Sequence, residues 1–172
     1  MPADFADGTK TVNWTITHAG KTYTVPGRIG SAAYSMGYAP AAAGSLPPSV
    51  KWTPEGEAST TRLGVWAEPI TAKVGAAVPL SVWVDDRSER PEKGRVTTTF
   101  LKHQGPIGSK VTFEPASIRL DNGTGQASAT ATFDTPGEYV VRARVDNFGA
   151  SDSSWGNQCC WSNAYVKVTV TP

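Results

Sequence analysis

Two adjacent cysteines and two tryptophans make residues 146–162 the most chemically distinctive stretch of the chain. Cys159 and Cys160 are the two cysteines of the sequence, and adjacent cysteines can form a vicinal disulfide, remain buried thiols, bind a soft metal such as Cu(I) or Zn²⁺, or bridge two chains. A closed zinc site needs about four ligands, whereas the histidines, His18 and His103, lie far apart in the sequence. We therefore expect a vicinal disulfide that stiffens this stretch.

Trp155 and Trp161 flank the cysteines, and Asp152 and Asn157 lie in the same stretch. Exposed tryptophans stack on sugar rings and also mark protein interfaces. Connections longer than about 12 residues without regular structure are usually functional or disordered. We expect these four residues to contact a ligand, either a protein or a carbohydrate. The alternative is that Trp161 closes one end of the fold.

Four aspartates predict a second kind of chemistry: Asp85, Asp86, Asp146 and Asp152. Carboxylates at strand ends supply the hard oxygen ligands that Ca²⁺ prefers, and they suit Cu or Zn less well. The spacing is not that of an EF-hand, and aspartate is also a common turn cap. Two interpretations stay open: solvated turns without a cofactor, or a metal-binding protein or metal-dependent enzyme that also uses the cysteines.

Signals for catalysis, nucleic-acid binding and membrane insertion are missing from the sequence. No nucleophile elbow, zinc-protease helix motif or phosphate-binding glycine loop occurs. The 16 basic and 15 acidic side chains leave the chain near neutrality, whereas nucleic-acid binders show a basic surplus. No apolar run reaches the length of about 18 residues that a membrane helix requires. We therefore favour a protein that is not an enzyme.

Short alternating runs of apolar and polar residues must position these groups. Over 139–145, small or apolar residues alternate with two arginines, which is the period of a strand with one buried face. Further strands are predicted over 65–74 (interrupted by Pro69), 78–84, 95–102, 111–113, 117–120, 126–133 and 165–170. Capped apolar runs with helical spacing are absent. The sequence predicts an all-β fold.

The turn before these arginines resembles a known family. Asp134, Gly137 and Tyr139 are similar to the corner between strands E and F of immunoglobulin-like sandwiches, where the tyrosine hydroxyl bonds back to the backbone. The resemblance covers about residues 63–172 and extends to bacterial immunoglobulin-like and PKD-like (polycystic-kidney-disease-like) modules. It implies a Greek-key β-sandwich, with Phe100 where immunoglobulin domains keep a tryptophan.

The same resemblance implies that the loop after residue 84 and the loop after residue 145 meet at one end of the sandwich. That end would be the recognition surface. Modules of this type are mostly spacers, adhesion units or binding domains, so we expect a non-catalytic extracellular, cell-surface or periplasmic module. The chain begins without the pattern of a signal sequence.

Two further parts are expected ahead of the sandwich at 63–172. Residues 1–29 contain a β-hairpin pattern, and residues 30–62 form an extended connector rich in Pro, Ala and Gly. A lone hairpin is marginally stable, so it should pack on the sandwich, on a preceding domain or on a partner. Strand addition by the hairpin to a second copy would give a homo-oligomer or a filament.

Overall fold

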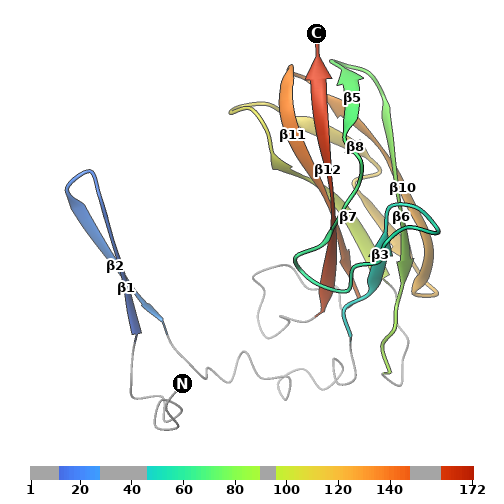
Figure 1. The fold of residues 1–172 in the computed structure, drawn as a ribbon, viewed down its shortest axis with the longest axis horizontal. Helices are drawn as coiled ribbons and strands as arrows, with labels where there is room; N and C mark the ends of the chain where they lie inside the picture. The colour runs from blue at the N-terminus through green and yellow to red at the C-terminus, as the bar shows by residue number, and fades with distance from the viewer. Residues whose placement is uncertain (1–11, 28–45, 90–95, 148–159) are drawn as a thin grey trace.

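The computed structural model describes residues 12–27, 46–89, 96–147 and 160–172 (Figure 1). Every regular element within these residues is a β-strand, and none of them is a helix long and apolar enough to cross a membrane. The first two strands, β1 (Val12–His18) and β2 (Lys21–Gly27), form a hairpin. The remaining strands are β3 (Ser49–Lys51), β4 (Val65–Trp66), β5 (Ile70–Lys73), β6 (Val78–Asp85), β7 (Val96–Gln104), β8 (Val111–Glu114), β9 (Ser117–Leu120), β10 (Thr124–Phe133), β11 (Gly137–Asp146) and β12 (Trp161–Thr171).

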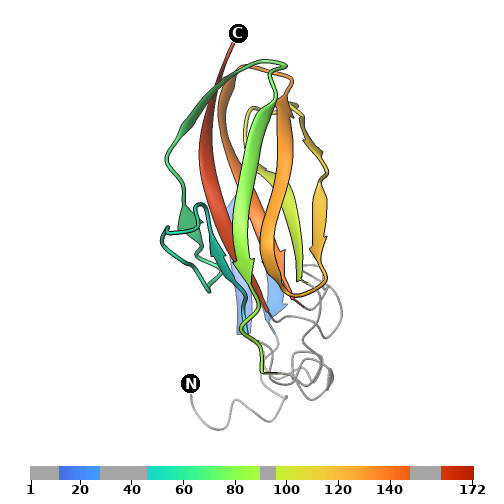
Figure 2. The same cartoon turned by 90° about the vertical axis from the view of Figure 1, so that its right-hand side faces the viewer.

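Strands β3 to β12 form two sheets that pack face to face (Figure 2). The four-stranded sheet has the order β3-β6-β10-β8, and the six-stranded sheet has the order β4-β12-β11-β7-β9, with β5 also pairing with β12. The chain crosses from one sheet to the other between β3 and β4, and from β5 to β11 each successive strand lies in the opposite sheet. The architecture is the all-β, immunoglobulin-like sandwich that the sequence predicts.

The core follows from the period of two. In β6 the side chains of Val78, Leu80, Val82 and Val84 are buried, and their neighbours in the strand are less buried or exposed. Phe100 is 1% exposed and its ring stacks on Phe113, with 6.2 Å between centroids. The Phe100 side chain therefore lies in the core of the sandwich, as predicted.

The corner at Tyr139 forms as the resemblance implies. The Tyr139 hydroxyl donates to the carbonyl of Thr135 at 2.7 Å, and its ring packs edge-on against Phe133. The backbone N–H of Lys110 donates to Asp134 Oδ1 at 2.9 Å, and this bond, followed by one from the Thr135 hydroxyl, lowers the pKa of Asp134 below its ordinary 3.8. Gly137 has φ of +144°, which favours glycine.

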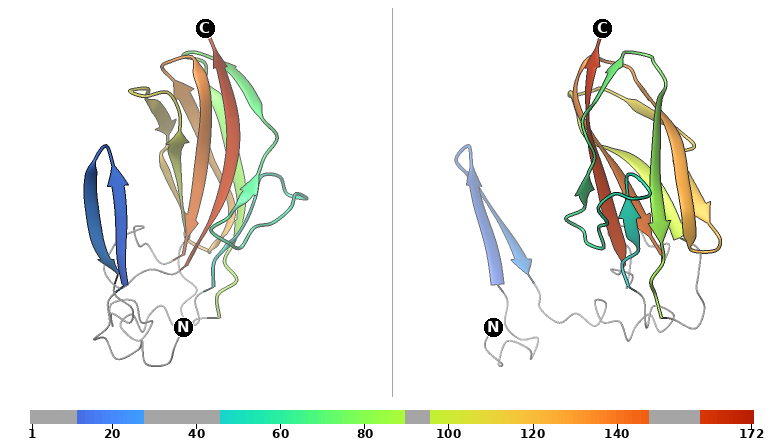
Figure 3. Two further views of the ribbon diagram at one scale, coloured as in Figure 1. Left: turned by 60° about the vertical axis from the view of Figure 1, so that its left-hand side comes forward. Right: turned by 45° about the vertical axis from the view of Figure 1, so that its right-hand side comes forward.

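The sandwich begins before the expected boundary at residue 63. We call residues 46–62 the leading segment: it contains β3, whose Val50 is fully buried and whose partner strand is β6 (Figure 3). Val50 and Ser59 exchange two backbone hydrogen bonds of 2.9 Å, which close the turn between them. Proline, alanine and glycine over residues 30–62 suggested a connector, but β3 within this range belongs to the four-stranded sheet.

The hairpin has two unlike faces. Thr15 pairs with Thr24 and Thr17 with Thr22 through side-chain hydroxyl contacts on one face. Large apolar side chains occupy the other face and are exposed: Trp14 by 70%, Ile16 by 59% and Tyr23 by 56%. The hairpin therefore presents an apolar face that the described residues leave uncovered.

Candidate functional site

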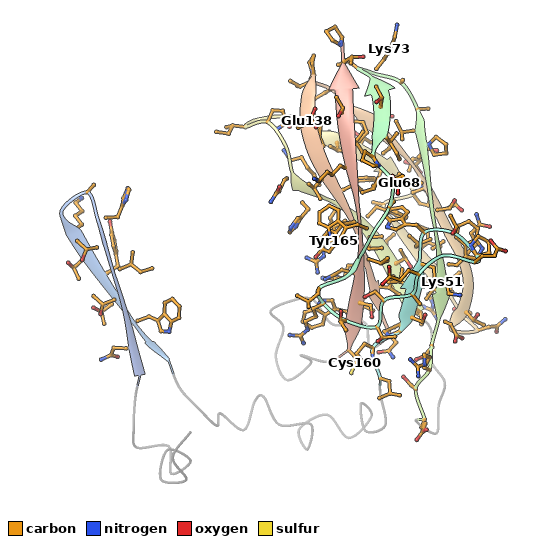
Figure 4. All side chains as sticks on the ribbon, viewed as in Figure 1. Lys51, Glu68, Lys73, Glu138, Cys160 and Tyr165 are labelled. Atoms are coloured by element: carbon orange, nitrogen blue, oxygen red, sulfur yellow. The ribbon has the colours of Figure 1, made fainter. Side chains whose placement is uncertain are left out.

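A buried polar cluster lies at the end of the sandwich where β11 ends opposite the start of β12. Figure 4 labels Cys160 at this end. Asp86 Oδ1 accepts hydrogen bonds from the Ser88 backbone N–H at 3.1 Å, the Ser88 hydroxyl at 2.6 Å and Asn147 Nδ2 at 2.9 Å. Asn147 Nδ2 also lies 2.7 Å from the carbonyl oxygen of Leu46 and 2.8 Å from Ser88 Oγ. Three segments far apart in sequence are therefore joined by one amide.

This cluster includes one of the four aspartates predicted to bind a cation. Asp86 is buried with its Oδ1 engaged by protein donors, Asp85 is exposed at the end of β6, and Asp146 is buried at the end of β11. Asp152 lies outside the described residues. Among the residues that the structure describes, no group of three or more His, Cys, Asp or Glu side chains has a metal-binding arrangement. The cation site stays a prediction.

The cysteine and tryptophan predictions fall partly on described residues. Cys160 is 1% exposed and disulfide-bonded, and Cys159, the other cysteine of the sequence, lies outside the described residues, as do Trp155 and Asn157. Trp161 belongs to β12 rather than to a loop and is 9% exposed. The guanidinium carbon of Arg62 lies 3.6 Å from the centroid of the Trp161 ring. Trp161 therefore packs under the leading segment and does not present a solvent-facing platform.

A groove that the sequence did not predict lies along the edge of the sandwich. Its volume is about 460 Å³, within the range usual for small-molecule sites. Three tryptophans from separate segments line it: Trp52 from the turn after β3, Trp66 from β4 and Trp83 from β6. We call it the tryptophan groove. It runs between the edge of the six-stranded sheet and β6 of the four-stranded sheet.

Contacts with the sandwich orient two of the three rings. Trp52 Nε1 donates to the carbonyl of Val65 at 3.4 Å, which ties the turn after β3 to β4. The Trp66 ring stacks on Tyr165 of β12, with 5.0 Å between centroids and 25° between planes. The His103 ring packs against Tyr165 in turn, at 5.3 Å. An aromatic row therefore continues from the groove across the outer face of the six-stranded sheet.

The aromatic row depends on a glycine, Gly64, whose backbone lies against the Tyr165 ring. Gly64 has φ of +78°, and a Cβ added there would lie 2.6 Å from Cε2 of Tyr165. Because glycine has no side chain, the backbone at residue 64 lies directly against the Tyr165 ring. Trp66 is nevertheless 52% exposed, so part of its ring is open to a ligand.

The polar part of the groove is acidic. Glu57 and Glu68 line it together with Thr53 and Ser81, and within the described residues the lining contains no Lys, Arg or His (Figure 4 labels Glu68). The signal available in the sequence was the high number of six tryptophans. It could not show that three of them meet, because Trp52 and Trp83 are brought together by the pairing of β3 with β6.

Comparison with known proteins gives only distant similarities. The sequence matches no protein-family model and no curated protein. Similar solved structures include the D00-D0 domain of intimin, which is 15% identical with a TM-score of 0.37, over 98% of this chain and 82% of that chain. The PKD domain of the KIAA 1837 protein is 17% identical with a TM-score of 0.33, over 67% of this chain and 91% of that one.

Domains 4 and 5 of the S-layer protein SbsC are 14% identical with a TM-score of 0.34, over 62% of this chain. The match spans 49%, about half, of that S-layer fragment. The fold assignment therefore rests on the strand order and the Tyr139 corner of the chain itself.

Proposed function

We propose that this chain is a non-catalytic, extracellular or cell-surface binding module that holds its ligand in the tryptophan groove. One observation carries the proposal: three tryptophans from separate segments converge on one groove, and one of them is half exposed on a fixed aromatic stack. Binding sites are typically concave and mostly apolar, with a few polar groups that orient the ligand. The groove has this composition.

A binding role agrees with the structural contacts made by the carboxylates and the histidine of the sandwich. The Asp86 carboxylate accepts hydrogen bonds that hold the fold, the Asp134 carboxylate caps a turn, and the His103 ring packs against Tyr165. These groups support structure, and the exposed aromatic surface is what the sandwich offers to a partner.

The disulfide at Cys160 supports an extracellular or periplasmic location. Disulfides persist in oxidising compartments and are rare in the cytosol.

The other recognition surface, through Trp155, Asp152 and Asn157, stays a proposal of its own, since these residues lie outside the described part of the chain.

A ligand screen with paired variants tests the groove. Wild-type protein and Trp66→Ala are applied to the same glycan array and the same displayed-peptide library. The control is Ile107→Ala, at an exposed apolar residue that does not line the groove. We expect at least one ligand that wild type and Ile107→Ala retain and Trp66→Ala loses. Ligands that all three proteins retain equally would contradict binding in the groove.

Self-association is a second candidate function, because the hairpin exposes Trp14, Ile16 and Tyr23 on one face. Exposed apolar faces with free strand edges favour pairing with another chain. The partner would be a second copy, to whose sheet the hairpin adds. Sedimentation at micromolar concentrations should then show a dimer or larger species that Trp14→Ala reduces; a monomer at every concentration would refute this candidate.

A further inference from the structure

The shape and chemistry of the tryptophan groove narrow the class of ligand. Indole rings stack well against the flat, C–H-rich faces of sugar rings and against other apolar groups. Trp66 is held by Tyr165 on one side, and Trp52 is held by its hydrogen bond to Val65. Rings fixed in advance lose little conformational entropy on binding, which raises affinity for a ligand with a flat face.

The polar groups select among such ligands. Glu57 and Glu68 provide carboxylate acceptors, and Thr53 and Ser81 provide hydroxyl groups that both donate and accept. Sugar hydroxyls match this set, since each can donate to a carboxylate and accept from a hydroxyl. The described lining has two carboxylates and no basic side chain. Lys167 Nζ lies 6.0 Å from the centroid of the Trp66 ring, but one ammonium group does not outweigh two carboxylates, so an anionic ligand such as a uronic-acid polymer is disfavoured.

The backbone beside the groove disfavours the main alternative, an extended peptide added to the sheet. Strand β3 pairs only with residues 83–85 of β6, so the described residues leave the same edge of β6 open over 78–82. An added strand needs alternating N–H and C=O groups along that edge. Pro79 has no N–H, and proline occurs in sheets where the missing donor faces an unpaired edge. Strand addition at this edge would therefore lack a donor.

We propose that the tryptophan groove binds a neutral saccharide chain. This proposal rests on the proposed function and adds the ligand class. Trp66 and Trp83 stack on sugar rings, Glu57 and Glu68 accept hydrogen bonds from sugar hydroxyls, and the row through Tyr165 extends the contact along a longer chain.

Native gel electrophoresis in gels that contain soluble polysaccharides tests the proposal. The neutral probes are hydroxyethylcellulose, xyloglucan and galactomannan, and polygalacturonate is the anionic probe. At least one neutral polysaccharide should retard the wild-type protein and the control variant Ile107→Ala, and polygalacturonate should not. Trp66→Ala and Trp83→Ala should each weaken the retardation about tenfold, because aromatic residues dominate binding energy at such contacts. Urea unfolding of each variant verifies that it is folded.

Other results would contradict the site, the role of the carboxylates or the saccharide itself. Retardation that both tryptophan variants retain would place the saccharide elsewhere, and equal retardation by polygalacturonate would contradict the role of the carboxylates. Migration unchanged by every neutral polysaccharide would overturn the saccharide proposal. If displayed peptides still bound in a Trp66-dependent way, the binding function would stand with another ligand; if they did not, both proposals would fail.

Discussion

Replacement of Asn147 by alanine should strongly destabilise the sandwich. Its side-chain amide is 2% exposed and lies within 2.9 Å of oxygens of Asp86, Ser88 and Leu46. These residues belong to the loop after β6 and to the leading segment. Alanine would remove the donor that joins both to the end of β11.

The magnitude follows from the bonds that are lost. A hydrogen bond to a charged group contributes about 1.5–3 kcal/mol, and a neutral one contributes about 1 kcal/mol. The amide has two N–H groups, so the Asp86 carboxylate and one of the two neutral acceptors account for the loss. We therefore expect Asn147→Ala to lower the free energy of unfolding by about 2.5–4 kcal/mol. Domains of this kind have a total of about 5–15 kcal/mol, so the variant should fold but unfold at much lower urea.

Urea titration followed by tryptophan fluorescence measures this loss. Asn122→Ala, in the exposed turn before β10, is the matched control and should change stability by less than about 0.5 kcal/mol. A loss below about 1 kcal/mol for Asn147→Ala, with an unchanged dependence on urea, would refute the role of the amide.

The same titration with Ca²⁺ or EDTA tests the cation site. A rise in the midpoint with Ca²⁺ that requires Asp86 would support a metal in place of the hydrogen-bonded cluster.

Three further predictions concern the corner and the aromatic row. Tyr139→Phe removes the 2.7 Å bond to the Thr135 carbonyl and should cost about 1–2 kcal/mol in urea unfolding, whereas Tyr165→Phe, whose hydroxyl has no hydrogen bond among the described residues, should cost little. Gly64→Ala places alanine in a left-handed backbone conformation and puts its Cβ 2.6 Å from the Tyr165 ring. It should therefore lower the free energy of unfolding by about 1–3 kcal/mol and weaken ligand binding in the groove. If neither stability nor binding changed, the packing of residue 64 against Tyr165 would be contradicted. Asp134→Asn should lower the melting temperature at pH 7. Because the pKa of Asp134 is lower in the folded state than its ordinary 3.8, the stabilisation is present above that value and lost as the pH falls through the folded pKa, so the difference between the two proteins should vanish in acid.

The strands and the corner could be predicted because their signals are local. The alternation in β6 and β11 and the interruption at Pro69, which separates β4 from β5, are patterns of neighbouring residues. Tyr139 bonds to a residue four positions away. The start of β12 lacked such a signal: Trp161, Ser162, Asn163 and Ala164 are all buried, because the leading segment covers the face that alternation leaves to solvent.

The site could not be predicted because its contacts are long-range. Asn147 bonds to Leu46, 101 positions away, and no local pattern of residues indicates a contact across that separation. The prediction of exposed aromatic residues was made for the stretch after residue 146. Trp161 of that stretch is buried under Arg62, whereas Trp66, which no loop signal marked, is exposed.

The leading segment links the buried cluster to the groove. Asn147 holds its first described residue, Leu46, β3 then pairs with β6, and the turn that follows supplies Trp52 to the groove. The Trp52 indole in turn donates to Val65 of β4, so the segment bridges the two sheets at this edge. Because the groove has walls from both sheets, a change that loosens the segment at Leu46 should widen the groove as well as lower stability. Asn147→Ala should therefore weaken binding even though Asn147 does not line the groove, whereas Tyr139→Phe, at a similar or smaller cost in stability, should leave binding unchanged.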